Sequence, residues 1–236
     1  MRNRLSLILP LILTAFVVHA YAASPAIPRQ AASQSTDARR ITRPTSKPYT
    51  GDLSIFEDPK RAQNLQINRV MDLLKIKSGS SVADIGAGSG WFTVRAARRV
   101  GAEGRVFAVE INEGYLKYSE ERAAAEKLAN IQTVLGTEED PKLSRESLDA
   151  VLILKTYHEI AQPIQVLAHL REAMRPQALL GVIDRNGNGR DHGIDRNVVI
   201  KEAAEAGFSL VEQYDFVKPD GMDYFLVFRV TPSGSH

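Results

Sequence analysis

The stretch that decides the fold is VADIGAGSG, residues 82–90. An apolar run ends in an acid, Asp84, and glycine then stands at positions 86, 88 and 90. Glycine lets the backbone turn sharply and lets a ligand approach it closely. A strand that leads through such a loop into a helix is typical of a cofactor site at the carboxyl end of a parallel strand.

The spacing of the glycines narrows the choice of cofactor. A dinucleotide site requires G-x-G-x-x-G, whereas this loop reads G-x-G-x-G, with Trp91 where the third glycine would fall. The Asp84 carboxylate would repel a pyrophosphate but would tolerate an ammonium or a sulfonium group. The loop therefore predicts a ligand with a cationic end and no phosphate, as in S-adenosylmethionine, although a tight turn without a ligand is the plainer alternative.

A second acid supports a nucleoside cofactor. Glu110 ends the next apolar run, 24 residues after Gly86, where a carboxylate can accept hydrogen bonds from both ribose hydroxyls. This feature suits NAD as well, so it discriminates little by itself.

From residue 51 onward, expected strands and helices alternate. Helices are expected at 60–75, 91–100, 113–129, 162–174 and 196–206, and strands at 81–85, 105–111, 131–135, 148–155, 179–184, 208–216 and 223–230. This alternation predicts an α/β fold with a mostly parallel sheet and helices on both faces. The turn sequence Lys218-Pro219-Asp220-Gly221 predicts that the last two strands form an antiparallel hairpin.

The amino-terminal residues resemble an export signal. Residues 1–22 contain Arg2 and Arg4, an apolar run and the small-x-small pattern Ala20-Tyr21-Ala22. We expect a cleaved signal peptide and a periplasmic protein, with an uncleaved membrane anchor as the alternative. Residues 23–50 have no apolar periodicity and are expected to be a disordered linker before a single domain at 51–236.

Composition excludes some functions. The chain of 236 residues has no cysteine, so disulfides, thiolate metal sites and a cysteine nucleophile are excluded. Seven of the 30 basic residues but only Asp37 of the 28 acidic residues fall in the first 50 positions, so the remainder carries a net charge of −4. Nucleic acid is not an expected partner, because the domain lacks the required excess of Lys and Arg.

Five segments in order resemble the class I S-adenosylmethionine-dependent methyltransferases: VADIGAGSGWFTVRAA, VFAVEIN, VLGTEEDPKL, SLDAVLILKTYHEI and GVIDRN. The resemblance covers about 56–230 and implies a Rossmann-like, seven-stranded sheet of order 3-2-1-4-5-7-6. It implies that the cofactor's methionine part, ribose and adenine contact a set of residues on the first three strands: Asp84, Gly86, Ala87, Gly88, Gly90, Glu110, Ile111, Thr137 and Glu138.

Two departures from the family pattern concern the adenine end and a turn. Many relatives have an aspartate where Thr137 stands, and Glu138 or Asp140 is a possible substitute. Relatives often have Pro-Gly-Gly before the fifth strand, where this chain has Pro176-Gln177-Ala178.

The expected reaction is transfer of a methyl group to a small-molecule acceptor by in-line displacement. His158 is the candidate base, with Tyr157 beside it, because both follow the fourth strand at the active edge of the sheet. Glu159 is expected to orient His158 or to cap the next helix, and a His158 bonded only to backbone is the structural alternative. A non-catalytic S-adenosylmethionine-binding accessory protein of the cell envelope and a nicotinamide oxidoreductase are the competing functions.

Two further segments are candidates for auxiliary roles. The loop 184–195 matches half of a calcium-binding loop, but a mobile lid is the plainer interpretation. Asp184, Asp191 and His192 are possible metal ligands together with His158. The expected reaction needs no metal, so this set is an alternative only. The helix before the first strand is expected to cover the cofactor, with Phe56, Asp58 and Gln66 as possible contacts.

Overall fold

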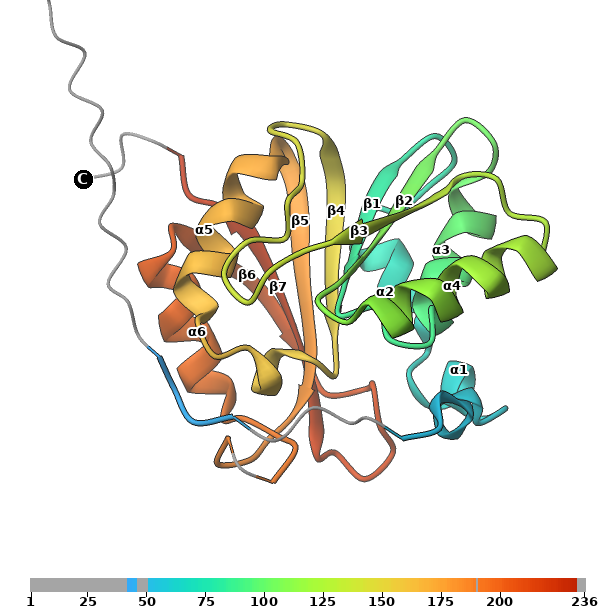
Figure 1. Cartoon of the computed structure of the whole chain (residues 1–236). Coiled ribbons are helices and arrows are strands. Elements are labelled where there is room, and N and C mark those ends of the chain that lie inside the picture. The colour runs from blue at the N-terminus through green and yellow to red at the C-terminus, as the bar shows by residue number, and fades with distance from the viewer. Residues whose placement is uncertain (1–41, 46–50, 190, 233–236) are drawn as a thin grey trace, which may run out of the picture. The chain divides into compact units, whose positions relative to one another are not determined.

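The computed structural model of the protein describes residues 42–45, 51–189 and 191–232. The predicted signal peptide and most of the predicted linker lie outside the described residues. The described part forms a seven-stranded sheet of order β3-β2-β1-β4-β5-β7-β6 (Figure 1). Its strands are β1 (Ser81–Ile85), β2 (Arg105–Glu110), β3 (Ile131–Leu135), β4 (Leu148–Leu154), β5 (Met174–Arg185), β6 (Phe208–Tyr214) and β7 (Asp223–Val230).

The direction of the strands confirms the predicted topology. β1 to β5 run parallel, and β7 lies antiparallel between β5 and β6. The Gly221 N–H donates to the Lys218 carbonyl at 3.1 Å in the connection between β6 and β7, so the predicted turn is present. β4 is almost continuously buried, as expected of a strand covered on both faces.

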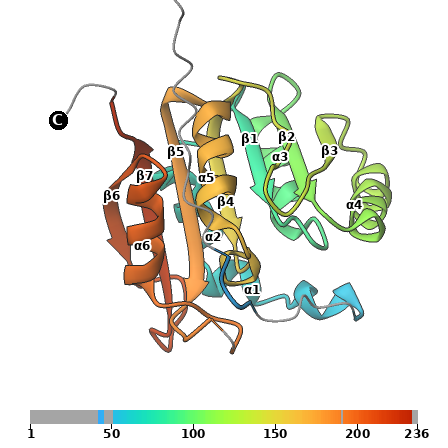
Figure 2. The ribbon, with the colours of Figure 1, turned by 60° about the vertical axis from the view of Figure 1, so that its left-hand side comes forward.

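Helices cover both faces of the sheet. The helical segments are η1 (Leu53–Glu57), α1 (Arg61–Asn64), α2 (Ile67–Leu73), α3 (Trp91–Val100), α4 (Glu113–Ala125), η2 (Tyr157–Glu159), α5 (Pro163–Ala173) and α6 (Arg196–Glu205). α5 and α6 contribute to one apolar core and α2 and α3 to the other, and Figure 2 shows α5 and α6 in front of the sheet with α2 behind it. α4 packs against β2 and β3.

Two elements differ from the prediction. The expected helix 60–75 is divided into α1 and α2, because Gln66 adopts a left-handed conformation (φ 47°) and its side chain donates to the Phe216 carbonyl at 3.2 Å. β5 begins at Met174 and includes Pro176, which has no N–H for the ladder. The pairing of β4 with β5 shifts register between Leu148 and Ala150, and this irregularity accommodates the proline.

The carboxyl ends of the parallel strands lie at one edge of the sheet. Figure 1 shows η1, α1, η2 and the loop after β5 gathered at this edge, at the bottom of the view. Such an edge is the usual ligand site of an open α/β sheet. None of the helices in the described ranges is long and apolar enough to cross a membrane.

Candidate cofactor and acceptor site

The glycine loop between β1 and α3 depends on conformations that favour glycine. Gly86, Gly88 and Gly90 have φ values of 71°, 53° and 69°. The N–H groups of Gly86 and Ala87 both donate to the Val109 carbonyl of β2, at 2.9 and 3.1 Å. A Cβ atom on Gly86 would collide with the Thr156 side chain, whereas one on Gly88 would meet only the Gly86 carbonyl oxygen, at 4.0 Å. The loop is therefore fixed below and open above, as a ligand cradle requires.

Glu110 joins the loop to the end of β2. Its Oε1 accepts the Gly88 N–H at 2.8 Å, and its Oε2 accepts the Ile111 N–H at 3.1 Å. Burial raises the pKa of Glu110, and these backbone hydrogen bonds oppose the increase. The Asn112 backbone N–H also interacts with this carboxylate, and a carboxylate has about four acceptor sites, so the group can still accept a hydrogen bond from a neighbouring hydroxyl.

Asp84 is a buried acid beneath the loop. Its Oδ2 accepts a hydrogen bond from the Thr93 hydroxyl at 2.6 Å, and only 2% of the residue is exposed. Burial raises the pKa of Asp84 to about 7; the charge of Glu110 adds to the increase, and Thr93 and Arg61 oppose it. The site thus contains an acid whose ionisation a nearby cation would favour.

The segment η1–α1 lies over this acid and the loop. Burial lowers the pKa of Arg61, the charges of Asp84 and Glu57 oppose the decrease, and its guanidinium lies 4.5 Å from the centre of the Trp91 ring. Glu57 accepts two hydrogen bonds from Arg122 of α4, at 2.5 and 3.0 Å, and one from the Ser89 hydroxyl at 3.1 Å. Glu57 thereby fastens the segment to the glycine loop.

The three expected lid contacts have different positions. Phe56 lies beside Arg61, with 5.7 Å between the guanidinium carbon and the ring centre. Asp58 accepts the Lys60 N–H within its own turn, and Gln66 bonds to the Phe216 carbonyl. Glu57 and Arg61 were not predicted from the sequence, because their partners, Arg122 and Trp91, are distant in the chain.

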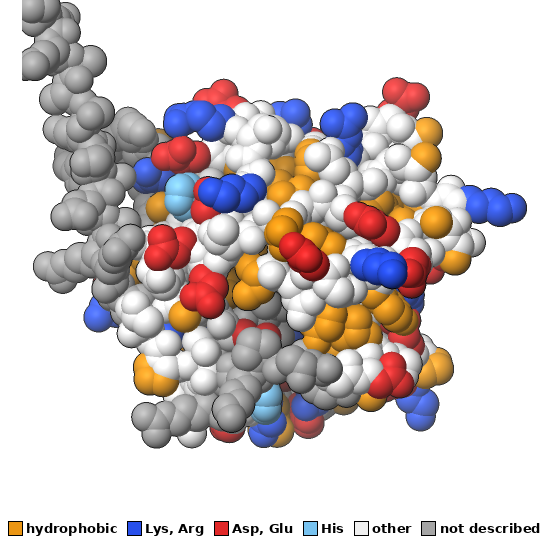
Figure 3. Space-filling view, viewed as in Figure 1, with side chains coloured by type: hydrophobic (Ala, Val, Ile, Leu, Met, Phe, Trp, Pro, Cys, Tyr) orange, Lys and Arg blue, Asp and Glu red, His pale blue; other side chains and the backbone are white. Residues whose placement is uncertain are grey.

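The predicted adenine contacts lie next to Glu110 at the ends of β2 and β3. The Gly136 N–H donates to the Glu110 carbonyl at 2.9 Å, which brings Thr137 and Glu138 to this point. Both are exposed, and the Thr137 hydroxyl accepts the Asp140 N–H at 3.0 Å. Ile111 is 53% exposed, and Figure 3 shows hydrophobic side chains at the surface near the start of α4. An apolar surface beside hydrogen-bonding groups suits a nucleobase.

His158 lies in η2, directly after β4, and pairs with a carboxylate from β5. Its Nδ1 is 2.9 and 3.0 Å from the two carboxylate oxygens of Asp184, which also accepts the His158 backbone N–H at 3.0 Å. An ionised carboxylate can only accept hydrogen bonds, so we assign the ring proton to Nδ1. The pairing thus goes beyond a bond to backbone, and it leaves the Nε2 lone pair available.

His158 belongs to a cluster of metal-ligating groups, and its Nε2 is 3.8 Å from Glu159. Among the described residues, the group that could hold an ion is His158, Glu159 and His192, with one ligand atom from each within 4.8 Å of the others. Burial raises the pKa of Glu159; the charge of His158 lowers it, and the charges of Glu110 and Asp184 raise it. The group differs from the set considered from sequence, because Asp184 bonds to Nδ1 and Asp191 accepts the Asn188 N–H at 3.1 Å.

Tyr157 does not join His158. Its hydroxyl donates to Glu202 of α6 at 2.7 Å, and the residue is fully buried. Burial and the charge of Glu202 raise the pKa of Tyr157 well above its usual value. These contacts give Tyr157 a structural position between η2 and α6 and do not support the catalytic role expected from sequence.

Residues 42–45, here called the strap, contact the same turn. Arg43 donates to the Tyr157 carbonyl and, at 2.7 Å, to Glu202. Its backbone N–H donates to the Ala161 carbonyl at 3.1 Å. Four described residues of the expected linker therefore lie against the domain and hold η2 from outside.

The loop 184–195 uses its carboxylates and amides for its own structure. Asp195 caps α6 by accepting the Asn197 N–H at 2.7 Å, and Asn186 accepts the Arg196 N–H at 3.3 Å. Asp184 is engaged by His158. These groups do not converge as calcium ligands, so the loop does not support the calcium alternative.

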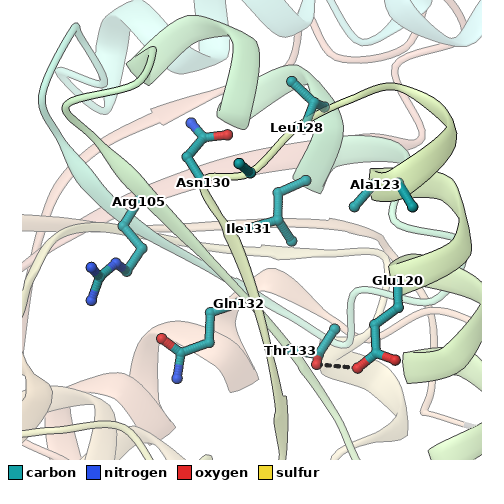
Figure 4. Close-up of a pocket in the computed structure, with 10 residues that line it drawn as sticks. Arg105, Glu120, Ala123, Leu128, Asn130, Ile131, Gln132 and Thr133 are labelled. Carbon is teal, nitrogen blue, oxygen red and sulfur yellow. Dashed lines mark hydrogen bonds between the residues drawn. The ribbon is translucent and has the colours of Figure 1, made fainter.

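A surface groove lies away from this edge. It has a volume of about 630 Å³ between α4 and β3, and Figure 4 shows Glu120 and Thr133 joined across it by a hydrogen bond of 2.5 Å. Arg105, which lines the groove, begins β2, whereas Glu110 ends that strand. The groove is therefore separate from the glycine loop.

Comparison with known proteins finds a family match over part of the chain. Residues 82–177 match the family described as "Methyltransferase domain". A curated relative is the demethylmenaquinone methyltransferase of Listeria monocytogenes serotype 4a (strain HCC23), which is 25% identical over 114 residues. The match covers 48% of each chain, so this chain spans about half the length of that relative.

Two solved structures share the fold over most of the chain. A SAM dependent methyltransferase from Aquifex aeolicus has a TM-score of 0.69 and 21% identity, over 76% of this chain and 97% of that one. The [4+2]-cyclase SpnF has a TM-score of 0.62 and 13% identity, over 81% of this chain and 88% of that one. The matched family span contains the glycine loop, Glu110 and η2.

Proposed function

We propose that this chain is a class I S-adenosylmethionine-dependent methyltransferase that methylates a small-molecule acceptor by in-line displacement. The methyltransferase-domain match and the named relatives support both the reaction and the cofactor. The observation that carries the proposal is the arrangement of Asp84 and Glu110 around an open glycine loop without a basic phosphate-binding residue of its own.

The residues of the site divide the work of binding. Glu110 would hold the ribose, Ile111 and Thr137 would flank the adenine, and Asp84 would favour the positive charge of the methionine part. S-adenosylmethionine supplies a methyl group on a sulfonium, which keeps the bonding electron pair when the methyl group leaves. Arg61 and Glu57 lie in the segment that would exclude water from this reaction.

His158 is the group that would activate an acceptor carrying a proton. Asp184 fixes the ring and stabilises the imidazolium that forms, so Nε2 can take the acceptor proton and release it to solvent. Effects of this kind contribute roughly 10²–10⁴-fold to a rate, whereas positioning of the acceptor contributes more.

The first experiment is calorimetric titration of the protein with S-adenosylmethionine. We expect micromolar binding by the wild type and by Glu172→Ala, which removes an exposed ion pair with Arg145, and loss of binding in the Asp84→Ala, Glu110→Ala double variant. A folded wild-type protein that does not bind S-adenosylmethionine would contradict the proposal.

The second experiment is turnover with a panel of acceptors, including demethylmenaquinone because the curated relative is named for it. Product methylation by the wild type, reduced in His158→Gln, supports the enzyme. Binding of S-adenosylmethionine without turnover across the panel would favour the non-catalytic accessory protein. The relatives are named as enzymes, which argues against this alternative. The cyclase with the same fold makes this second step necessary, because fold alone does not fix the reaction.

Export is a separate proposal that rests on residues 1–22. Cell fractionation and mass spectrometry of the protein's amino terminus test it. A periplasmic protein beginning after Ala22 is the expected result, and an intact leader in the membrane fraction would support the anchor instead.

A further inference from the structure

We propose that His158, Glu159 and His192 bind a divalent metal ion of the zinc type beside the cofactor, with one coordination position left for the acceptor. The inference rests on the proposed function for its chemical purpose only, because metal binding can be measured without turnover. The ligand atoms of these three residues, from η2 and from the loop after β5, lie within 4.8 Å of one another.

The orientation of His158 is the first argument. Asp184 is fully buried, and it accepts N–H groups from the His158 ring, the His158 backbone and the Arg185 backbone. The ring is therefore locked with Nδ1 toward Asp184 and Nε2 toward Glu159, whose Oε1 is 3.8 Å away. Histidine ligands of metals are held in this way by a carboxylate on the other ring nitrogen.

The presentation of His192 is the second argument. The Gly189 N–H donates to the Gly193 carbonyl at 2.7 Å, and the Ile194 N–H donates to the Arg185 carbonyl at 2.8 Å. These bonds close the loop and bring the His192 ring to 5.8 Å from the His158 ring, at 88° between the ring planes. Edge-on rings at this distance can direct two nitrogens at a common point.

The spacing fits an ion after a small adjustment. Zinc binds nitrogen and oxygen ligands at about 2.0–2.2 Å, so ligand atoms of a tetrahedral site are about 3.3–3.6 Å apart. The separation between His158 and Glu159 is 3.8 Å, and the widest separation in the group is below 4.8 Å. Closing the difference requires movement of about 1 Å, which the partly exposed Glu159 and the exposed His192 can make while His158 stays fixed.

The local charge favours a cation. Glu159 experiences the negative charges of Asp184 and of Glu110, the acid at the cofactor loop. The neighbouring Lys155 forms an ion pair with Asp223.

The ligand types indicate the kind of metal and its use. Two imidazoles and one carboxylate form a catalytic zinc set with an open fourth position. A hydroxyl group on the acceptor that occupies this position has a lowered pKa, so it can lose its proton to solvent before it receives the methyl group. In this form of the reaction His158 holds the ion and does not act as the base.

The test uses the full chain, freed of metal by a chelator and titrated with Zn²⁺ against a chromophoric competitor. We expect one high-affinity equivalent in the wild type, and Co²⁺ should give the visible absorption of a tetrahedral site. His192→Ala and Glu159→Gln, both at partly exposed positions, should weaken Zn²⁺ binding at least tenfold. Asp184→Asn should weaken it roughly 10- to 100-fold through the orientation of His158.

The control is His169→Ala, which removes the same residue type from α5 and should bind Zn²⁺ like the wild type. Equal Zn²⁺ affinity in His192→Ala, Glu159→Gln and the wild type would overturn the proposal, as would a folded wild type that binds no Zn²⁺. Titration of the same metal-free protein with S-adenosylmethionine separates the two ideas. Binding of the cofactor without Zn²⁺ binding would reject the metal site and leave the proposed function in place.

Discussion

At the scale of single residues, we expect Asp84 to couple cofactor binding to pH. The pKa of this acid is about 7 because it is buried. A folded pKa above the ordinary 3.8 means that the contribution of Asp84 to stability is full below pH 3.8 and is lost as the pH rises through about 7. A bound sulfonium or ammonium group offsets this loss because it favours the ionised form.

We therefore predict that S-adenosylmethionine binds about tenfold more tightly at pH 8 than at pH 6, with release of a proton near pH 6. Calorimetry in two buffers of different ionisation enthalpy measures the proton. Asp84→Asn should release none and show a weaker pH dependence. Proton release by the variant equal to that of the wild type would assign the effect to another group.

Gly86 and Gly79 provide a matched pair. Both have positive φ, at 71° and 79°, but a Cβ on Gly79 meets nothing within 4 Å, whereas one on Gly86 collides with Thr156. Gly79→Ala should cost about 1 kcal/mol of unfolding free energy from backbone strain alone. Gly86→Ala should cost more, by about 1–3 kcal/mol, and should also weaken cofactor binding; chemical denaturation and calorimetry measure the two effects. Equal losses in the two variants would show that the collision is relieved.

The binding residues that sequence predicted are those set by local spacing. Asp84, the glycines and Glu110 occupy fixed positions at strand ends, so an alternating pattern is enough to locate them. The partners of Tyr157 and His158 were not predictable in the same way, because Glu202 and Asp184 follow 45 and 26 residues later. Which of two adjacent residues faces the site depends on the tertiary packing of η2.

At the scale of elements, Glu57 provides a charged contact for the segment η1–α1, which we propose covers the cofactor. Glu57 joins it to Arg122 and Ser89, and both members of the ion pair are less than one-third exposed. We predict that Glu57→Gln speeds the dissociation of S-adenosylmethionine roughly three- to tenfold, or about 1 kcal/mol. Stopped-flow displacement measures this rate.

The control for this prediction is Glu172→Ala, which removes an exposed ion pair with Arg145 elsewhere. It should leave the dissociation rate unchanged. A rate in Glu57→Gln that matches this control would mean that the cover does not limit release.

Element boundaries show where periodicity succeeds and where it fails. α3 spans the predicted 91–100, because glycines stand at both ends. The pattern of apolar residues continued through Gln66, but the helix breaks there because a side-chain bond to Phe216 competes with helical geometry. β5 includes Pro176 because its pairing with β4 shifts register there. The sequence of β5 alone does not show how its neighbour pairs with it.

At the scale of the whole molecule, the contacts of the strap extend the folded unit beyond the expected domain start at residue 51. The Arg43 and Glu202 side chains are 11% and 8% exposed, so removing one leaves the other charge nearly buried. We predict that Arg43→Ala lowers the free energy of unfolding by about 2–4 kcal/mol, and that Arg43→Lys lowers it less.

A chain that begins at residue 42 and one that begins at residue 46 differ only in the strap. Comparing them measures the contribution of the strap to stability without a substitution. The longer chain should unfold at a higher temperature by several degrees, as measured by circular dichroism or calorimetry. Identical midpoints for the two chains, together with an unchanged Arg43→Ala variant, would show that the strap contributes nothing to stability.

The strap also sets an order of events as the chain is made. Arg43 is synthesised long before Tyr157 and Glu202, which follow it by 114 and 159 residues. Its contacts close large loops. Such contacts form late, because the chain loses conformational entropy on closing the loop before the new contacts stabilise it. The glycine loop and Glu110 are 22 residues apart at their hydrogen bond, so this contact closes a much shorter loop at a smaller entropy cost. We therefore expect the contacts of the strap with the turn that carries His158 to form after the bond between Glu110 and the glycine loop.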